Sequence, residues 1–300
     1  MKNIETKCGF VAVVGRPNAG KSSLLNSIIG EKIAMVSHKA NATRKRSNII
    51  AMNGKDQIIF VDTPGIHESE KLINQFMLDE ALRAIGDCDL ILFLAPITDK
   101  LDHYESFLEK NKKNTPHIVL LTKIDMVSQE EILLKSAKYA KYSDKYEALM
   151  PISIKKELDI KYLLDLIVKY LPISPLLYDS EILTTDHIRD IYKEFIREAI
   201  FEKISDELPY EADVKIDKIE EKQNVDVIRA TIIVEKDSQK GMIIGKGGES
   251  IKRIGKAARS KIEYLSQKKA FLELFVSVKK GWSKNKKGLK EMGYDIDLIK

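Results

Sequence analysis

An eight-residue segment near the N-terminus has the composition and spacing of a phosphate-binding loop. It follows the pattern G-x-x-x-x-G-K-S and comprises Gly15, Arg16, Pro17, Asn18, Ala19, Gly20, Lys21 and Ser22. An apolar run at 10–14 precedes it and helical periodicity follows it, so we expect a strand, a tight turn and a helix. Main-chain N–H groups of such a turn point inward and bind phosphate. Lys21 would reach the terminal phosphates, and the hydroxyl of Ser22 would bind Mg²⁺.

A second polar turn should meet this loop. It comprises Asp62, Thr63, Pro64 and Gly65 and follows the apolar run at 58–61. An acidic side chain at Asp62 can hold the magnesium ion through water. Gly65 has no Cβ, so its N–H can approach a terminal phosphate closely. A simple Pro-Gly turn is the alternative, and its position after a phosphate-binding pattern favours the nucleotide site.

A third turn carries the residues that would select the base. It comprises Thr122, Lys123, Ile124 and Asp125 and follows the apolar run at 118–121. The carboxylate of Asp125 can accept hydrogen bonds from guanine N1–H and the exocyclic amine, a donor pair that adenine lacks. The aliphatic stem of Lys123 can lie over the base. Ser153 and Ile154 follow the run at 149–152, where a main-chain N–H could reach the guanine oxygen.

The elements that must position these turns alternate along residues 1–172. We expect strands at 10–14, 49–52, 58–61, 90–94, 118–121 and 149–152, and helices at 72–85, 101–110, 129–142 and 158–171. This alternation predicts an α/β domain with a mostly parallel sheet covered by helices on both faces. Ligands of such sheets bind beyond the carboxyl ends of the strands, where the polar turns lie.

Length and composition limit the possible classes of protein. The 300 residues suggest two domains, and 44% of them are hydrophobic and 32% charged. The two cysteines, Cys8 and Cys88, form no disulfide framework, so we expect a reducing, cytoplasmic location. The N-terminus lacks the apolar core of a signal peptide, and no apolar run approaches the roughly 20 residues of a membrane span.

Positive charge is concentrated near the C-terminus. Residues 241–290 contain 14 Lys and Arg against 3 Asp and Glu, whereas the net charge of the whole chain is only +5. Basic regions attract nucleic-acid backbones or anionic lipid, and a solvated lysine-rich surface is the alternative.

The region after Pro172 predicts a second, α+β domain. An amphipathic helical run covers 188–204, and strands are expected at 213–219, 225–235 and 271–278. In the second of these strands we expect the inward face to shift between Val227 and Ala230. A short apolar turn at 242–244, a G-x-x-G loop and a basic amphipathic helix precede the third strand.

The motifs up to about residue 171 resemble those of the translation-factor-like branch of the Ras-like GTPases. The resemblance implies GTP binding, hydrolysis to GDP, and a Mg²⁺ ion held by Ser22, Thr43 and Asp62. It places Thr43 and Gly65 in switch segments that order on the γ-phosphate and relax after hydrolysis. The candidate catalytic residues are then Asn18, Lys21, Thr43 and Gly65.

Three positions depart from the family pattern. Thr122 replaces an asparagine, which should weaken a tether to the phosphate-binding loop, and Ile154 replaces an alanine beside the base. Ile66, also counted among the nucleotide contacts, replaces the glutamine that orients the attacking water in Ras. GTPases with such a hydrophobic residue often use K⁺ held by an asparagine at the position of Asn18. We therefore expect slow, K⁺-stimulated hydrolysis, and a simple turn-forming role for Asn18 is the alternative.

The C-terminal motifs resemble a type II KH domain, which clamps about four nucleotides of single-stranded RNA. The resemblance assigns RNA contacts to Ile244, Gly245, Lys246, Gly247, Gly248, Ile251, Lys252 and Arg253. A structural α/β module with a basic surface is the alternative. Trp282 could stack on a base or pack at a domain edge.

Together the two halves resemble the Era family of GTPases, with domains at 1–172 and 187–300 and a linker at 173–186. The resemblance implies binding to small-subunit ribosomal RNA near its 3′ end, assistance in assembly of the small ribosomal subunit, and peripheral association with the inner membrane. We expect a monomer. One rival is a P-loop kinase or ATPase, against which Asp125 argues, and another is an RNA-binding scaffold with a non-hydrolysing nucleotide site. A membrane surface is a third possible use of the basic region.

Overall fold

The computed structural model describes residues 5–31, 34, 44, 46–64, 72–204 and 208–294, with the side chains of 72–76, 79 and 210 left aside. Three residues named above, Thr43, Gly65 and Ile66, lie outside the described residues. Among the described residues, the chain divides into two compact units between Thr185 and Asp186, except that residues 72–76 are grouped with the second unit.

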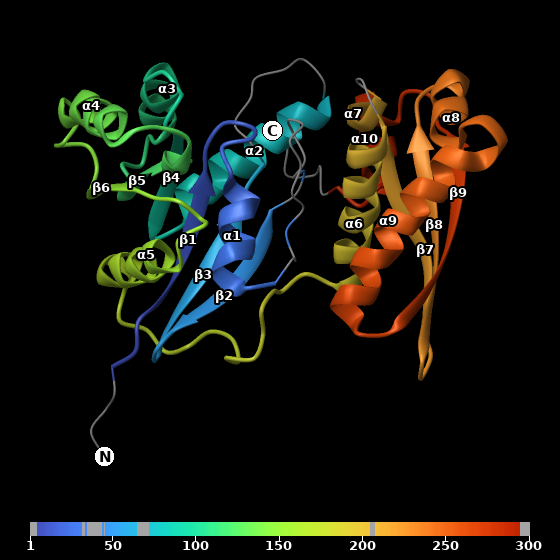
Figure 1. The fold of residues 1–300 in the computed structure, drawn as a ribbon, viewed down its shortest axis with the longest axis horizontal. Coiled ribbons are helices and arrows are strands. Elements are labelled where there is room, and N and C mark those ends of the chain that lie inside the picture. The colour runs from blue at the N-terminus through green and yellow to red at the C-terminus, as the bar shows by residue number, and fades with distance from the viewer. Residues whose placement is uncertain are drawn as a thin grey trace. The chain divides into compact units, whose positions relative to one another are not determined.

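The first unit is built on a six-stranded sheet of order β2-β3-β1-β4-β5-β6 (Figure 1). The strands are β1 (Cys8–Val14), β2 (Ser47–Asn53), β3 (Asp56–Asp62), β4 (Leu90–Pro96), β5 (His117–Thr122) and β6 (Ala148–Pro151). Every neighbouring pair is parallel except β2 with β3. The helices are α1 (Lys21–Ile29), α2 (Leu72–Asp87), α3 (Asp102–Lys110), α4 (Gln129–Ala140) and α5 (Glu157–Tyr170). The predicted α/β fold is confirmed.

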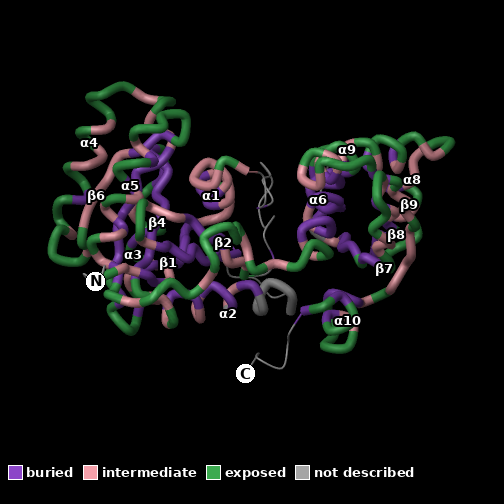
Figure 2. Tube along the Cα trace, turned by 90° about the horizontal axis from the view of Figure 1, so that it is seen from below, coloured by how far each residue is buried: buried purple, intermediate pink, exposed green. Residues whose placement is uncertain are grey.

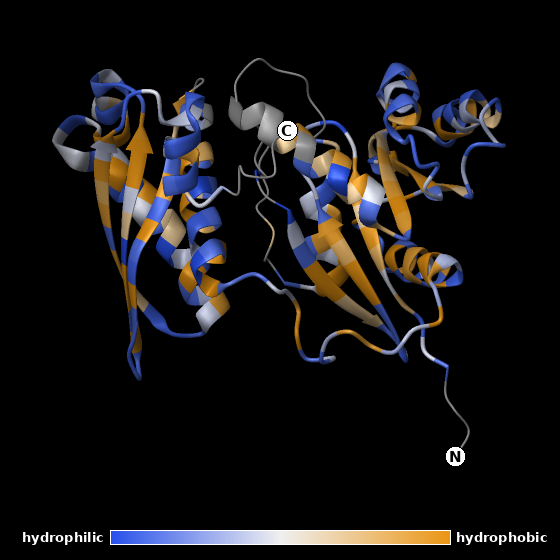
Figure 3. Cartoon of the chain, turned by 180° about the vertical axis from the view of Figure 1, so that it is seen from behind, coloured by the Kyte–Doolittle hydropathy of each residue, from blue (hydrophilic) through white to orange (hydrophobic). Residues whose placement is uncertain are grey.

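The central strands are buried on both faces, as a sheet between two helical layers requires. In β1, Val11 and Val13 pack in a cluster with residues of α1 and α5, whereas Ala12 and Val14 pack with α3 and α4. All residues of β4 and β5 are buried. Figure 2 shows this buried interior, and Figure 3 shows that the strands are the most hydrophobic part of the unit.

Much of the segment predicted to be a linker is hydrogen-bonded to the first unit. The side chain of Gln57, which is fully buried, accepts from the main-chain N–H groups of Leu177 at 3.0 Å and Tyr178 at 3.1 Å. Further along, Ile50 N donates to Leu183 O at 2.9 Å. The segment therefore covers the main chain of β2, which would otherwise be an open sheet edge.

The second unit has the order helix, two strands, two helices and strand that type II KH domains share. Its helices are α6 (Ile188–Lys203), α7 (Leu208–Glu211), α8 (Asp237–Ile244), α9 (Glu249–Ser266) and α10 (Lys286–Glu291). Its strands are β7 (Asp213–Glu221), β8 (Val225–Val234) and β9 (Lys269–Val278), in the order β7-β8-β9. The pair β7 and β8 is antiparallel, and β8 and β9 are parallel. Among the described residues, no helix has the length and apolarity to cross a bilayer.

Two expectations for this unit were wrong in detail. The apolar run at 242–244 is the last turn of α8 rather than a separate turn. The register irregularity lies in β7, between Ile216 and Lys218, so β8 keeps one inward face throughout. Asp226 occupies that face and is 3% exposed, and the hydroxyl of Tyr192 donates to its Oδ2 at 3.4 Å. The predicted shift of the inward face was wrong because a buried acid, Asp226, occupies a position where the pattern expects an apolar residue.

Trp282 packs inside the second unit. It is 1% exposed, and its Nε1 donates to the carbonyl of Glu211 at 3.2 Å. A Cβ on Gly288 would lie 2.4 Å from the main-chain oxygen of Trp282, so this contact needs glycine. Of the two roles considered for Trp282, the structure favours packing over base stacking.

Candidate functional site

The phosphate-binding loop is a tight turn between β1 and α1. Asn18 and Gly20 have φ angles of 63° and 104°, and the N–H of Ala19 donates to Arg16 O at 3.2 Å. A Cβ on Gly15 would lie 2.8 Å from Leu94 O, so a larger residue there would displace β4 or the loop. The loop is thus held by its own backbone conformation and by the neighbouring strand.

Lys21 folds back into the loop that it closes. Its Nζ donates to Gly15 O at 3.2 Å and to Arg16 O at 3.3 Å, and the residue is 7% exposed. Burial lowers the pKa of Lys21 to about 8, although the nearby Asp62 carboxylate opposes that shift. A nearby anion stabilises the charged form of a buried ammonium group. A phosphate bound beside Lys21 would therefore offset the cost of its burial.

Two of the three predicted metal ligands meet at the carboxyl end of the sheet. The hydroxyl of Ser22, at the start of α1, donates to Asp62 Oδ2 at 3.0 Å, and Asp62 is 1% exposed at the end of β3. The next residue, Thr63, donates its hydroxyl to Val13 O at 2.7 Å and fixes the turn against β1. Hydroxyl and carboxylate oxygens are the donors that Mg²⁺ prefers, so this pair fits the metal.

The turn after β5 is tied to the phosphate-binding loop. Thr122 Oγ1 donates to Ala19 O at 3.2 Å, so the threonine keeps one hydrogen bond to the loop. Lys123, with a φ of 61°, donates from Nζ to Asn18 O at 3.0 Å. The neighbouring Ile124 packs against the apolar cluster that contains Ala12 and Val14 of β1, and its side chain carries no polar group.

Asp125 lies in a cluster of donors that the following loop supplies. Its carboxylate accepts from Ser153 Oγ at 3.0 Å and from Lys155 Nζ at 2.5 Å. The hydrogen bond from Lys155 holds the pKa of Asp125 below its usual range, so the group is an anion at neutral pH. Ile154 presents its main chain here, where its oxygen accepts from Ser27 Oγ at 3.2 Å. Sequence reasoning missed Lys155 as a partner of Asp125, although Lys155 directly follows Ser153 and Ile154 in the sequence.

In the second unit, the G-x-x-G loop turns between α8 and α9. Gly245, Gly247 and Gly248 have φ angles of 72°, 59° and 79°. A Cβ on Gly245 would lie 2.6 Å from the Cβ of Ser250. The loop residue Lys246 is exposed, and so are Lys252 and Arg253 on α9, whereas Ile244 and Ile251 are half-buried. The backbone is therefore bare enough for a sugar-phosphate chain to lie close to it.

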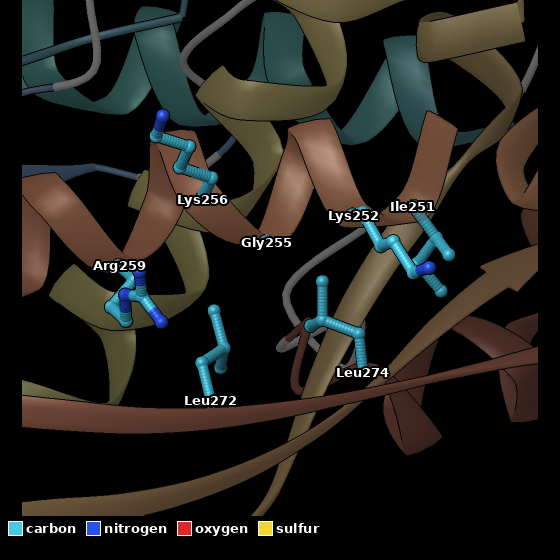
Figure 4. Close-up of a pocket in the computed structure, with 7 residues that line it drawn as sticks. All are labelled: Ile251, Lys252, Gly255, Lys256, Arg259, Leu272 and Leu274. Atoms are coloured by element: carbon cyan, nitrogen blue, oxygen red, sulfur yellow. The ribbon is translucent and has the colours of Figure 1, made fainter. Parts of the chain in front are cut away.

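A pocket of about 350 Å³ lies between α9 and β9 (Figure 4). It is lined by Ile251, Lys252, Gly255, Lys256, Arg259, Leu272 and Leu274. The two leucines form an apolar wall that suits bases, and the three cations suit phosphates. Five of these residues were not predicted. The spacing of Lys252, Lys256 and Arg259 at i, i+4 and i+7 could have predicted the basic side of this pocket. The two leucines belong to β9, which the same helical pattern does not include.

Comparisons with known proteins agree with both units. The family described as "50S ribosome-binding GTPase" matches residues 10–123, and the KH domain family matches residues 207–283. The chain is 54% identical to a "GTPase Era" of Campylobacter lari, over 96% of this chain and 99% of that protein. It is 49% identical to a "GTPase Era" of Helicobacter pylori strain G27, over 97% of this chain and 98% of that protein.

Two solved structures cover almost the whole chain. One is an Era in complex with MgGDPNP and nucleotides 1506–1542 of 16S ribosomal RNA, with a TM-score of 0.92 and 33% identity over 96% of this chain and 99% of that one. The other is a single-substitution variant of Aquifex aeolicus Era bound to GDP·AlF4⁻, with a TM-score of 0.91 and the same identity and coverage.

Proposed function

Because the chain belongs to the Era family of GTPases, we propose that it is a GTP-driven switch that assists assembly of the small ribosomal subunit. GTP hydrolysis and binding of ribosomal RNA are the activities of this family. The observation that carries the nucleotide half of the proposal is the meeting of Lys21, Ser22 and Asp62 at one end of the sheet. The RNA half depends on the G-x-x-G loop and the pocket beside it.

The residues of the first unit divide the work of binding and hydrolysis. The main chain from Gly15 to Ser22 cradles the phosphates, and Lys21 neutralises charge that develops as the terminal phosphoryl group departs. Ser22 and Asp62 would hold Mg²⁺, which would supply positive charge to offset the negative charge of the phosphates. Thr43, Gly65 and Ile66 are further proposed nucleotide contacts, and they lie outside the described residues.

Asp125 is proposed to select guanine, and a base-exchange experiment tests this role. An ionised carboxylate accepts from guanine N1–H and N2–H, whereas the amide of Asp125→Asn could donate to the C2 oxygen of xanthine. The variant should therefore prefer xanthosine triphosphate over GTP in competition binding. Unchanged preference for GTP would contradict the assignment.

Potassium stimulation is proposed on the strength of Asn18. This asparagine lies inside the phosphate-binding loop with a φ of 63°, and its main-chain oxygen accepts from Lys123. An additional cation beside the phosphates would supply charge stabilisation that Ile66 has no polar group to supply. Turnover should be several-fold faster in K⁺ than in Na⁺ buffer and should lose that difference in Asn18→Ala. Equal rates in both cations would refute the idea.

The proposed RNA is the 3′ end of small-subunit ribosomal RNA, and the solved Era complex that contains nucleotides 1506–1542 of 16S ribosomal RNA supports this proposal. The triple variant with Lys246, Lys252 and Arg253 changed to Gln should lose most of its affinity for that RNA. Coupling between nucleotide and RNA must be reciprocal, so a non-hydrolysable GTP analogue should tighten RNA binding relative to GDP. Identical RNA affinity with GDP, analogue and no nucleotide would refute the switch. GTP turnover by the purified protein would exclude the alternative of an RNA-binding scaffold with a non-hydrolysing nucleotide site. Absence of turnover would support that alternative.

We also propose that the protein is a cytoplasmic monomer that associates peripherally with the inner membrane and with the small ribosomal subunit. The basic stretch at 241–290 supports attraction to both anionic lipid and RNA. Flotation with vesicles of anionic or neutral lipid tests the membrane part. Light scattering tests the monomeric state.

A further inference from the structure

We infer that Asp99, in the loop after β4, is a positioning residue that orients the phosphate-binding loop through Arg16. Nothing in the sequence motifs assigns Asp99 a role, since it lies between the predicted strand and helix. The inference depends on the proposed hydrolysis of GTP by the first unit.

Asp99 and Arg16 form a two-point ion pair. Arg16 Nε donates to Asp99 Oδ2 at 2.6 Å, and Arg16 Nη2 donates to Asp99 Oδ1 at 2.6 Å. The Asp99 side chain is only 6% exposed and the Arg16 side chain 32%. The hydrogen bond to Asp99 raises the pKa of Arg16 above its usual range. Two parallel hydrogen bonds between planar groups fix orientation as well as distance.

The partner carboxylate is itself firmly held. The N–H of Asp99 donates to Pro96 O at 2.8 Å, and the N–H of Ile97 donates to Thr122 O at 3.0 Å, which joins this turn to β5. Lys135 on α4 donates from Nζ to the main-chain oxygen of Asp99. Asp99 therefore connects the phosphate-binding loop to the sheet and to α4.

The main chain of Arg16 connects the ion pair with Asp99 to Lys21 in the phosphate-binding loop. Its carbonyl oxygen accepts from the N–H of Ala19 at 3.2 Å and from Lys21 Nζ at 3.3 Å. Its own Nη1 donates to Pro17 O at 3.1 Å, which stiffens the turn. A peptide group that orients the Lys21 ammonium is thus held in place by a side chain outside the loop.

The same contacts argue against Arg16 as a direct phosphate ligand. Its guanidinium donates to Asp99 from two nitrogens and to Pro17 O from the third. Turning it toward a phosphate would leave the Asp99 carboxylate buried without its cation, which is costly. The arrangement favours a positioning role.

The test compares Asp99→Asn with Asp144→Asn, an exposed aspartate of the same unit. Asp99→Asn keeps the size of the side chain but loses the two-point ion pair. We expect kcat for GTP to fall about 10-fold, because small misplacements of a catalytic group are costly, while GDP affinity changes less than about 3-fold. Asp144→Asn should match the wild type in both quantities. Unchanged kcat in a folded Asp99→Asn protein would overturn the inference.

Variants of Arg16 show whether Asp99 acts through that residue. The double variant Arg16→Gln/Asp99→Asn is compared with the single variants Arg16→Gln and Asp99→Asn. Its kcat should be no lower than that of the slower single variant, whereas multiplied losses would show independent roles and overturn the inference. If Asp99→Asn fails to fold, Arg16→Lys replaces it, since lysine keeps the charge but cannot form the two-point pair. Full kcat in Arg16→Lys would then overturn the inference. Absence of GTP turnover in the wild type would instead refute the proposed function.

Discussion

Oγ of Ser22 lies 3.0 Å from Oδ2 of Asp62, so the first turn of α1 and the end of β3 meet at a single point. β1 pairs directly with β3, with Val13 opposite Asp62, and this register sets the meeting. The strand that leads into the phosphate-binding loop and the strand that delivers the acid are therefore neighbours, which is the arrangement a magnesium-bound nucleotide requires.

Loss of either proposed Mg²⁺ ligand, Ser22 or Asp62, should lower the rate of GTP hydrolysis more than it lowers the affinity for GDP. Ser22→Ala and Asp62→Asn should each lower kcat by about 100-fold or more, since each would hold the ion that stabilises the transferred phosphoryl group. Ser23→Ala, one residue further along α1, is the matched control and should retain near-normal turnover. Wild-type dependence of turnover on Mg²⁺ concentration in Ser22→Ala would contradict the assignment.

The single hydroxyl of Thr122 should support nucleotide affinity through the loop that it holds. Thr122→Val removes the hydrogen bond to Ala19 O at nearly constant shape. A lost hydrogen bond that leaves a buried acceptor is worth about 1–3 kcal/mol, so GDP affinity should fall about 5-fold or more. Thr122→Asn should bind GDP at least as tightly as the wild type, because the amide offers more donors. Fluorescence titration with a labelled GDP measures both, and equal affinity in Thr122→Val would contradict the tether.

Variants of the pocket in the second unit should separate the contributions of bases and of phosphates to the affinity for RNA. Gly255→Leu should fill the pocket and lower affinity for single-stranded RNA, with little change in the dependence of affinity on salt. Arg259→Gln should instead lower the slope of log affinity against log salt by about 0.7. Gly255→Ala should bind RNA normally, because its Cβ would lie 3.6 Å from Leu274, an ordinary contact. Equal salt slopes in wild type and Arg259→Gln would exclude a phosphate contact.

His117 should make the first unit sensitive to mild acid. It is 2% exposed, and its Nε2 lies 2.8 Å from the hydroxyl oxygen of Tyr104. Burial lowers the pKa of His117 to about 4, whereas an unfolded histidine titrates near 6.5. Below pH 6.5 the unfolded state thus takes up a proton that the folded state refuses, so the free energy of unfolding should fall between pH 6.5 and 4.

Urea unfolding of the first unit at pH 7 and pH 5 measures this effect. His117→Phe should lose part of the difference between the two pH values, although the variant is less stable at both. His103→Gln, which changes an exposed histidine on α3, should keep the wild-type difference. A full wild-type difference in His117→Phe would show that other groups cause the acid sensitivity.

Local motifs were predictable because their function depends on residues that are close in sequence. A phosphate-binding loop needs a positive φ at Gly20 and a lysine directly after it, and both follow from eight consecutive residues. The alternation of strands and helices was equally legible, since buried parallel strands such as β4 are continuous apolar runs.

Hydrophobic pattern failed where a polar group is buried with a partner. Asp226 lies on the inward face of β8, where Tyr192, on α6, donates to one oxygen of its carboxylate. The sequence alone gives no sign of that contact. The same limit applies to Trp282, whose burial depends on α7 and on the close approach of Gly288.

The sequence by itself determined which groups the proposed chemistry depends on: the phosphate-binding pattern, the acid proposed to select guanine, and the glycine loop beside a basic helix. Only the tertiary structure decided how those groups are held, as in the pairing of Arg16 with Asp99 and of Thr122 with Ala19, and which leucines complete the pocket. The physical reason is that a motif fixes backbone conformation over a few residues. Contacts across 83 or 103 positions depend instead on strand order and on how helices pack over the sheet.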